Sequence, residues 1–232
     1  MKKIGVFIVE DSRFFVKRIS SIINDADDME LLGIAENGLE AVSKVKELDP
    51  DVITMDVSMP LLSGIGAVKQ IMATSPSRIL MLSAHTVEGA SDTFEALRAG
   101  AVDFISKDVD NFTKNIVADK IRAVAVSNLS QTSLVAPQQD LRKSEQNQKT
   151  YNAIVIGAST GGPVALESIL SGLPKEFNIP ILVVMHFPEG FATQFAQRMD
   201  ENVAIKVTEL ENNTFLEPGV VYITPGNTEV YF

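Results

Sequence analysis

The stretch IGVFIVEDS, residues 4–12, decides the fold of the first half of this chain. Six apolar or small residues stand in a row, and two acids, Glu10 and Asp11, end the run. A short unbroken apolar run that ends in polar residues is typical of a parallel strand buried on both faces. The acids also cut the run too short for a signal peptide, so we interpret it as a buried strand.

Four further apolar runs follow, and helical patterns separate them. The runs are LLGIA (31–35), DVITM (51–55), RILMLS (78–83) and AVDFI (101–105). In the first two helical patterns, the apolar residues that share one face are Phe15, Ile19, Ile22 and Ile23, and then Leu39, Val42, Val45 and Leu48. Such spacing is typical of amphipathic helices. Five strand–helix repeats therefore predict a doubly wound α/β domain over residues 1–127.

The pattern changes over residues 128–150, where five glutamines and three serines replace most apolar residues. We expect a polar linker there, because Pro137 argues against one continuous helix. A second α/β pattern occupies residues 151–232. Its expected strands lie in 151–157, 179–187, 204–210 and 220–224, with helices in 162–173 and 190–201. TEVYF, residues 228–232, is expected to form one more strand.

The composition of the 232 residues excludes several classes of protein. Hydrophobic residues make up 45% and charged residues 22%, which is ordinary for a globular protein. A net charge of -10 disfavours binding to nucleic acid or to anionic membranes. The absence of cysteine excludes disulfides and thiolate catalysis, and it fits a reducing cytoplasm. No run approaches the ~18 apolar residues of a membrane span, so we expect a cytoplasmic protein without membrane insertion.

Polar residues cluster where the predicted strands of the first domain end. Glu10 and Asp11 follow the first strand, Asp56 ends the third, Ser83 ends the fourth and Lys107 follows the fifth. The carboxyl ends of parallel strands share one edge, so these side chains are expected to meet. Three carboxylates that repel one another favour a hard divalent cation, and we expect Mg²⁺. The alternative is that acids after strands only cap the helices that follow. That alternative explains a single position well, but it does not explain why five polar residues stand at the ends of the strands.

Residues 1–127 resemble a response-regulator receiver domain. The motifs that carry the resemblance are Glu10-Asp11, Asp56 with Met59-Pro60 and Gly64, Ser83-Ala84, and Lys107. The resemblance implies a flavodoxin-like five-stranded parallel sheet and phosphorylation by a histidine kinase.

The resemblance also implies a role for each site residue. Asp56 would accept the phosphoryl group, Ser83 and Lys107 would contact that group, and Glu10 and Asp11 would hold Mg²⁺ together with Asp56. Phe104 stands at the family's aromatic switch position, although an ordinary core aromatic explains this residue equally well. His85 is expected in a loop near the phosphorylation face.

The stretch VIGASTGG, residues 155–162, presents Ser159 in the spacing G-x-S-x-G. Glycines allow a sharp turn from strand to helix, and the helix N-terminus offers N–H groups to an oxyanion. A simple helix cap or a phosphate site remains an alternative, although Pro163 stands where a P-loop needs lysine. His186 follows the next expected strand at the same sheet edge and is the candidate base for Ser159.

The second domain resembles the catalytic domain of the chemotaxis protein-glutamate methylesterases of the CheB type. IVIGASTGG (154–162), HFPEGF (186–191) and PGVVYITPGN (218–227) carry the resemblance, and so does the order of receiver, linker and hydrolase. It implies hydrolysis of glutamate methyl esters on the cytoplasmic helices of methylated chemoreceptors, with glutamine deamidation as a related reaction. Ser159 would attack the ester and His186 would relay the proton, once receiver phosphorylation relieves blockage of the active site.

The third member of the triad is missing from this pattern. The family's triad aspartate lies beyond TPGN, and Asp200, interpreted as a solvated helix residue, is the one aspartate after residue 150. We therefore expect residues 151–232 to be the N-terminal part of a truncated, Rossmann-like hydrolase domain with weak esterase activity or none. The alternative is a non-catalytic phospho-receiver signalling module that carries an inert remnant of the hydrolase.

Overall fold

The computed structural model describes residues 2–84, 87–108, 112–129, 151–188, 190–226 and 228–231, without the side chains of residues 87–90. The chain divides into two compact units, Met1–Thr132 and Ser133–Phe232, and each is described by itself. Most of the predicted linker 128–150 lies outside the described residues, and so does His85.

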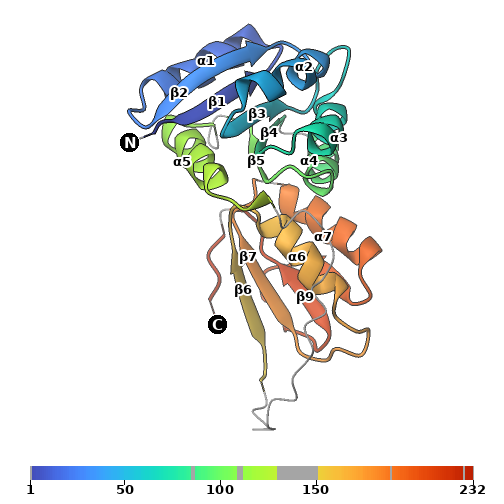
Figure 1. Ribbon diagram of the computed structural model, residues 1–232. Helices are drawn as coiled ribbons and strands as arrows, with labels where there is room; N and C mark the ends of the chain where they lie inside the picture. The colour runs from blue at the N-terminus through green and yellow to red at the C-terminus, as the bar shows by residue number, and fades with distance from the viewer. Residues whose placement is uncertain are drawn as a thin grey trace. The chain divides into compact units, whose positions relative to one another are not determined.

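The first unit contains a parallel sheet of five strands in the order β2-β1-β3-β4-β5. Its strands are β1 (Ile4–Val9), β2 (Met29–Ala35), β3 (Val52–Asp56), β4 (Ile79–Ser83) and β5 (Asp103–Ser106). Its helices are α1 (Arg13–Asn24), α2 (Gly38–Leu48), α3 (Gly64–Thr74), α4 (Val87–Arg98) and α5 (Lys114–Ala125). The predicted doubly wound fold is confirmed (Figure 1).

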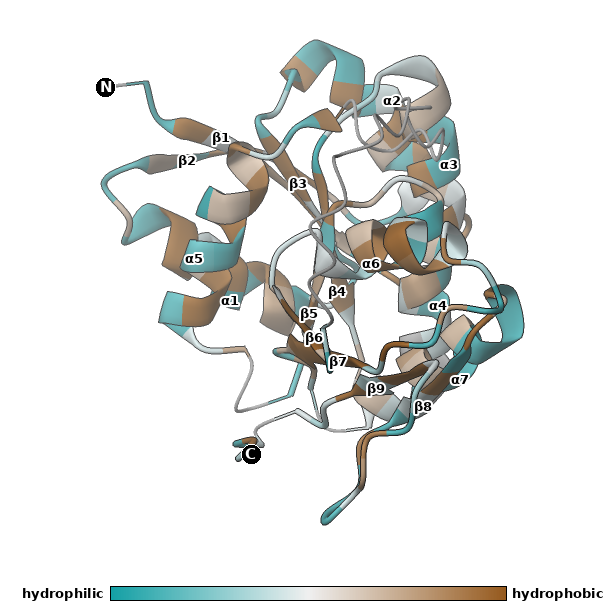
Figure 2. Ribbon diagram, turned by 90° about the horizontal axis from the view of Figure 1, so that it is seen from below, coloured by the Kyte–Doolittle hydropathy of each residue, from teal (hydrophilic) through white to brown (hydrophobic). Residues whose placement is uncertain are grey.

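Two layers of helices bury this sheet. Helix α1 contacts α5 on one side, while α2 contacts α3 and α3 contacts α4 on the other. Because both faces are covered, β3 and β4 are buried along their whole length, and Figure 2 shows the strands in the brown of hydrophobic residues. The core on the α1 and α5 side joins Ile8 of β1 to Ile19 of α1 and Ile121 of α5.

The structure corrects one detail of the helical pattern. Leu39 was expected on the buried face of α2, but its side chain is 52% exposed. The buried face instead runs through Gly38, Ala41 and Val45. The helix begins at Gly38, directly after its N-cap Asn37, whose side chain accepts a hydrogen bond from the Glu40 N–H. This start places Leu39 on the solvent side of the first turn.

The second unit contains a parallel sheet of four strands in the order β6-β7-β9-β8. Its elements are β6 (Ile154–Ala158), α6 (Gly162–Ser171), β7 (Ile181–Met185), α7 (Phe191–Asn202), β8 (Lys206–Glu209) and β9 (Val220–Ile223). Figures 1 and 2 show α6 and α7 on the same side of the sheet. The pattern of parallel strands and covering helices agrees with the expected partial Rossmann-like domain.

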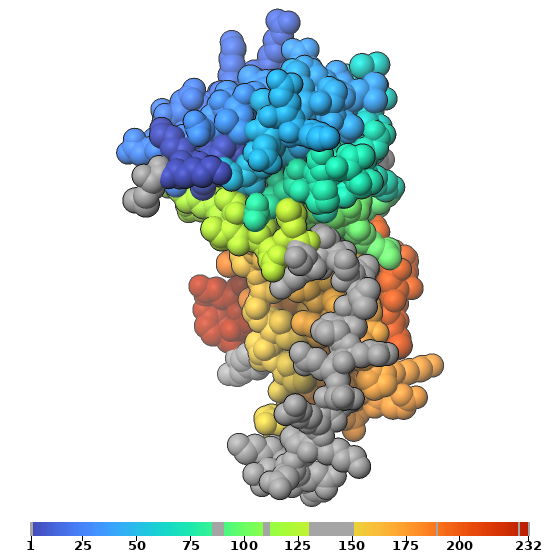
Figure 3. Space-filling view, viewed as in Figure 1, coloured from blue at the N-terminus to red at the C-terminus, as the bar shows by residue number. Residues whose placement is uncertain are grey.

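The face of this sheet opposite the helices is covered only in part. Leu182, Val220 and Tyr222 form a small cluster there, with Val230 packed against it. Val155 of the edge strand β6 is 58% exposed. The prediction of a strand over residues 228–232 is wrong for the described residues 228–231, which lie outside any strand, and Val230 packs its side chain against the cluster. Figure 3 shows these last residues, in dark red, at the surface of the second unit.

Candidate functional site

Three strands of the first unit bring charged side chains together at their carboxyl ends. The Lys107 ammonium lies 2.8 Å from Glu10 Oε2 and 2.8 Å from Asp56 Oδ1. Glu10 and Asp56 are buried, and the Lys107 side chain is only 11% exposed. The other oxygen of Glu10 accepts a hydrogen bond from the Ser12 N–H, at 3.1 Å, just before α1 begins. The turn from β1 into α1 therefore fixes the Glu10 carboxylate beneath the lysine.

The surroundings of these carboxyl groups disfavour their charged forms. Burial raises the pKa of Glu10 above its ordinary value and the Asp56 charge raises it further, although Lys107 opposes both effects. Burial likewise raises the pKa of Asp56 against the lowering effect of Lys107, and the Asp11 charge adds to the rise. One ammonium thus pairs with two carboxylates while the charge of Asp11 lies close to Asp56, which leaves an excess of negative charge for a further cation to neutralise.

The same three acids form a group that can hold a metal ion. Glu10, Asp11 and Asp56 each offer an oxygen, and these oxygens lie within 4.8 Å of one another. Asp11 is exposed, so the group is open to water on one side. A set of oxygen ligands with room for water molecules fits Mg²⁺, which keeps several waters when it binds to proteins.

Ser83 and Phe104 lie on the face of the sheet opposite to that of Asp56, because Asp56 pairs with Leu82 in the register of β3 and β4. The Lys107 N–H donates to the Ser83 carbonyl, at 2.7 Å, and Ser83 pairs with Ser106 in the register of β4 and β5. Phe104, two residues before Ser106, therefore shares a face with Ser83. Its buried ring meets Phe94 of α4 edge to face, with 6.2 Å between centroids. The position fits a core aromatic and a switch residue equally well.

Sequence reasoning missed Phe15 as part of this site. The pattern of α1 marked Phe15 only as an apolar-face residue, and its ring does pack against the core. However, the Lys107 ammonium also lies 4.6 Å from the centroid of that ring. Nothing in the sequence signals this contact, because it joins residues 92 positions apart.

Ser159 and His186 stand at neighbouring positions in the second unit. Ala158 pairs with Met185 at the ends of β6 and β7, and Ser159 and His186 are the next residues of the two strands. Neighbouring strands are about 4.8 Å apart, so the two backbones leave the sheet side by side. Both side chains are exposed, and neither makes a hydrogen bond to a described part of the chain. The two strands are therefore neighbours, which is the condition under which His186 can approach Ser159.

The loop after β9 reaches the same edge of the sheet. The Thr224 N–H donates to the Val183 carbonyl at 2.9 Å. A side chain at Gly226 would place its Cβ 1.9 Å from the Phe187 carbonyl oxygen, directly after His186. Only glycine fits this close approach, so Gly226 holds the loop against the backbone that carries His186.

Asp200 is occupied elsewhere. It lies in the last turn of α7, is exposed, and its carboxylate accepts a hydrogen bond from the Val207 N–H at 2.7 Å. This bond ties the end of α7 to β8. Within the described residues, no carboxylate makes a hydrogen bond to His186.

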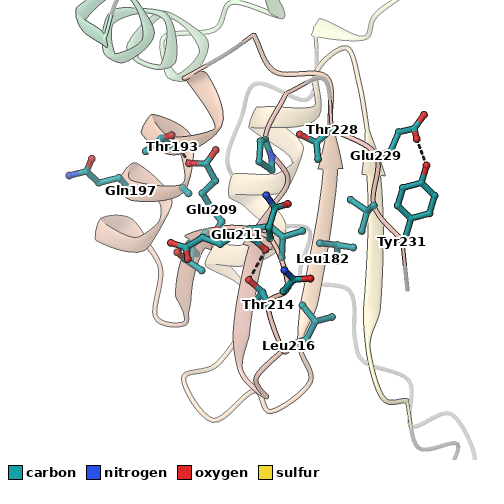
Figure 4. A pocket seen from close by; sticks show the side chains of 18 of the residues that line it. Leu182, Thr193, Gln197, Glu209, Glu211, Thr214, Leu216, Thr228, Glu229 and Tyr231 are labelled. Atoms are coloured by element: carbon teal, nitrogen blue, oxygen red, sulfur yellow. Dashed lines mark hydrogen bonds between the residues drawn. The ribbon is translucent and has the colours of Figure 1, made fainter.

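A pocket of about 1120 Å³ lies between α7, β8 and the C-terminal residues of the second unit (Figure 4). Four of the lining residues are acidic, and they are Asp200, Glu209, Glu211 and Glu229. Figure 4 shows Thr193 donating to Glu209 and Tyr231 donating to Glu229. Neither Ser159 nor His186 is among the lining residues, so the pocket is separate from the candidate nucleophile.

Comparison with protein families divides the chain in the same way. Residues 6–117 match the model of the response regulator receiver domain, and residues 154–232 match the model of CheB methylesterase. No helix in the described ranges combines the length and the apolar character that a membrane span needs.

Curated relatives match almost the whole chain. A protein-glutamate methylesterase/protein-glutamine glutaminase of Thermotoga maritima is 42% identical over 97% of this chain and 67% of its own. Its counterpart in Caldanaerobacter subterraneus is 39% identical over 97% of this chain and 66% of its own, and one from Vibrio vulnificus is 37% identical over 98% and 70%. The chain thus spans about two thirds of the length of these relatives.

Solved structures match the first unit. The response regulator domain of Thermotoga maritima CheB has a TM-score of 0.51 and 44% identity, over 55% of this chain and 99% of that one. The receiver domain of a putative response regulator, NarL, from Mycobacterium tuberculosis has the same TM-score at 24% identity over 55% of this chain and 100% of its own, which shows the shared fold alone.

Proposed function

The chain belongs to the protein-glutamate methylesterase/protein-glutamine glutaminase family, and from this premise we propose that it is a phosphorylation-controlled hydrolase of glutamyl methyl esters on chemoreceptors. Deamidation of receptor glutamines is the related reaction. The observation that carries the proposal is the pairing of Lys107 with Glu10 and Asp56 at one sheet edge, on a chain that also sets Ser159 beside His186.

In the receiver, Asp56 is the proposed phosphoacceptor. A carboxylate oxygen of Asp56 forms a bond to the phosphorus of a kinase phosphohistidine while the phosphorus–nitrogen bond breaks, and the histidine leaves. Glu10, Asp11 and Asp56 would hold Mg²⁺, which supplies positive charge to the transferring oxygens when bound. The Lys107 ammonium neutralises charge on the same side, and Ser83 would contact the phosphoryl group.

In the second unit, Ser159 is the proposed nucleophile. Its oxygen attacks the ester carbonyl as His186 takes the hydroxyl proton, and His186 then gives that proton to the departing methoxide. Methanol leaves, and water hydrolyses the resulting ester of Ser159. Phe104 is the candidate switch residue, whose side chain would respond to phosphorylation of Asp56.

The rate of this hydrolysis depends on a group that orients His186. Asp200 bonds to Val207, and no other carboxylate within the described residues orients His186. Loss of the acid that orients a triad histidine costs on the order of 10⁴ in turnover.

That shortfall favours a second candidate function. Among the described residues, the receiver site has its charged partners in place, whereas the side chains of Ser159 and His186 make no hydrogen bond. In the second candidate, the chain accepts phosphate from a histidine kinase and releases no methanol. Both candidates place the protein in the cytoplasm, with a histidine kinase as partner and with receptor helices as substrate in the first.

The deciding experiment measures methanol release from methylated receptor by the purified chain, with and without acetyl phosphate and Mg²⁺. Phosphorylation of Asp56 is followed in the same samples, with Asp56→Asn as the control. Release that rises with the phosphodonor and disappears in Ser159→Ala would support the hydrolase. No release with Asp56 labelled would support the signalling module. Undiminished labelling in Asp56→Asn would contradict the assignment of the phosphoacceptor.

A further inference from the structure

We propose that Phe15 is a positioning residue that holds the Lys107 ammonium at the phosphoryl-accepting carboxylate, a role that rests on the proposed function of the receiver. The ammonium lies 4.6 Å from the ring centroid of Phe15 and 2.8 Å from both Glu10 Oε2 and Asp56 Oδ1. It therefore has carboxylates and an aromatic face as its neighbours. A cation within about 6 Å of an aromatic centroid is attracted by the ring.

Lys107 needs such a contact because its side chain is long and flexible. Four rotatable bonds separate the ammonium from the backbone, and an ammonium pairs with any nearby oxygen. The carboxylates that hold it now are also the candidate ligands of a divalent cation, which competes for the same oxygens. The ring of Phe15 has no oxygen and so does not compete for a hard cation. It stays in contact with the Lys107 ammonium even when the carboxylates bind a divalent cation instead of the lysine.

The ring itself is held in place. Phe15 meets the fully buried Phe112 edge to face, with 5.3 Å between centroids and 78° between planes. Arg18, one turn further along α1, lies 5.2 Å from the centroid of Phe112 and donates a hydrogen bond to the Phe112 carbonyl. Lys107, the rings of Phe15 and Phe112, and Arg18 thus contact one another in a row. These contacts link α1 to the segment that follows β5. The pair of rings is therefore a packed support beside the Lys107 ammonium.

This support matters during phosphoryl transfer. Negative charge passes from Asp56 to the phosphoryl oxygens, and Lys107 must turn from one to the other. A cation–ring contact has little directional demand compared with a hydrogen bond, so the ammonium can turn while it stays over the ring. Phe15 thus acts through Lys107 and touches none of the reacting atoms.

The test uses the full chain and three substitutions in α1. Phe15→Leu keeps an apolar side chain and removes the ring, while Phe15→Tyr keeps the ring. Phe14→Leu is the matched control, because Phe14 is the neighbouring aromatic, is 64% exposed and contacts Phe15 rather than Lys107. The initial rate of Asp56 labelling by acetyl phosphate with Mg²⁺ is measured for each. We expect Phe15→Leu to lower this rate by about fivefold, the size of a partly buried cation–ring contact, and Phe15→Tyr to retain it.

A spectroscopic signature separates this role from ordinary packing. Protons above an aromatic ring resonate upfield, so the ε-methylene protons of Lys107, assigned with Lys107→Arg, should be shifted upfield. The shift should persist in Phe15→Tyr and Phe14→Leu and disappear in Phe15→Leu. Urea midpoints of all variants show whether any loss of rate is a loss of folding.

Three results would overturn the proposal. One is a labelling rate in folded Phe15→Leu equal to that of the wild-type chain. Another is an equal loss in Phe15→Tyr and Phe15→Leu, and the third is a methylene shift that Phe15→Leu leaves unchanged. If the wild-type chain were not labelled at Asp56, the proposed function of the receiver would fail, and the methylene shift alone would decide whether Phe15 holds Lys107.

Discussion

At the scale of single residues, the receiver site lowers the stability of the fold at neutral pH, because two buried carboxyl groups must be charged there. Glu10 and Asp56 are both buried, their pKa values are raised by burial, and they share the one ammonium of Lys107. At pH values between the unfolded and the folded pKa of these groups, the folded state binds protons that the unfolded chain has already released. The stability that these groups contribute is therefore full below the unfolded pKa values, and it is lost as pH rises through the folded ones.

Replacing one of the two acids should relieve this cost. In buffer with EDTA, we expect Asp56→Asn to raise the unfolding free energy of the first unit at pH 7 by on the order of 1 kcal/mol, because Lys107 then pairs with Glu10 alone. The gain should shrink as pH falls towards 4. Hydrogen exchange of peptides from β1 and β3 in the full chain measures this change in the unfolding free energy.

The matched control is Asp27→Asn, which removes an exposed carboxylate. This control should leave the unfolding free energy nearly unchanged at both pH values. A destabilised Asp56→Asn chain at pH 7 would contradict the argument.

At the scale of elements, glycine decides how the loops after β7 and β9 meet. A Cβ on Gly226 would fall 1.9 Å from the Phe187 carbonyl oxygen, which is backbone and cannot rotate away. The loop that begins at Thr224 must therefore move if this glycine is replaced. His186 precedes Phe187 directly, so the same movement would disturb the candidate base.

We expect Gly226→Ala to destabilise the second unit by about 2 kcal/mol, in the range of other overpacking substitutions. Hydrogen exchange of peptides from β7 and β9 gives the value. Gly157→Ala is the control, because a Cβ there meets no atom within 4 Å. Equal behaviour of the two variants would show that the loop can yield without cost.

At the scale of the whole molecule, the chain pairs a receiver unit with a candidate hydrolase unit. If Asp56 controls Ser159, the phosphodonor can act on hydrolysis only through Asp56. We therefore expect methanol release by the wild-type chain to increase with acetyl phosphate and Mg²⁺, and release by Asp56→Asn to be the same with and without the donor. Stimulation that survives in Asp56→Asn would mean that the donor acts by another route.

The sequence predicted the elements of both sheets well, because each strand and helix is a local pattern. The buried strands were visible as apolar runs, and Pro163 lies in the first turn of α6, as such a residue should. Two predictions failed. Leu39 is exposed because of where the N-cap Asn37 starts α2, and residues 228–231 form no strand, with Val230 packed against side chains that are distant in the sequence.

The candidate site divides along the same line. By itself, the sequence determined which chemical groups follow the strands. It also determined that Glu10, Asp56 and Lys107 lie at one edge, because the carboxyl ends of parallel strands share an edge of the sheet. Only the tertiary structure decided that one ammonium bridges both acids while it lies over the Phe15 ring, and that Gly226 lies against Phe187. These contacts join residues far apart in the chain, and their geometry follows from how helices and loops pack on the sheet, which no local pattern encodes.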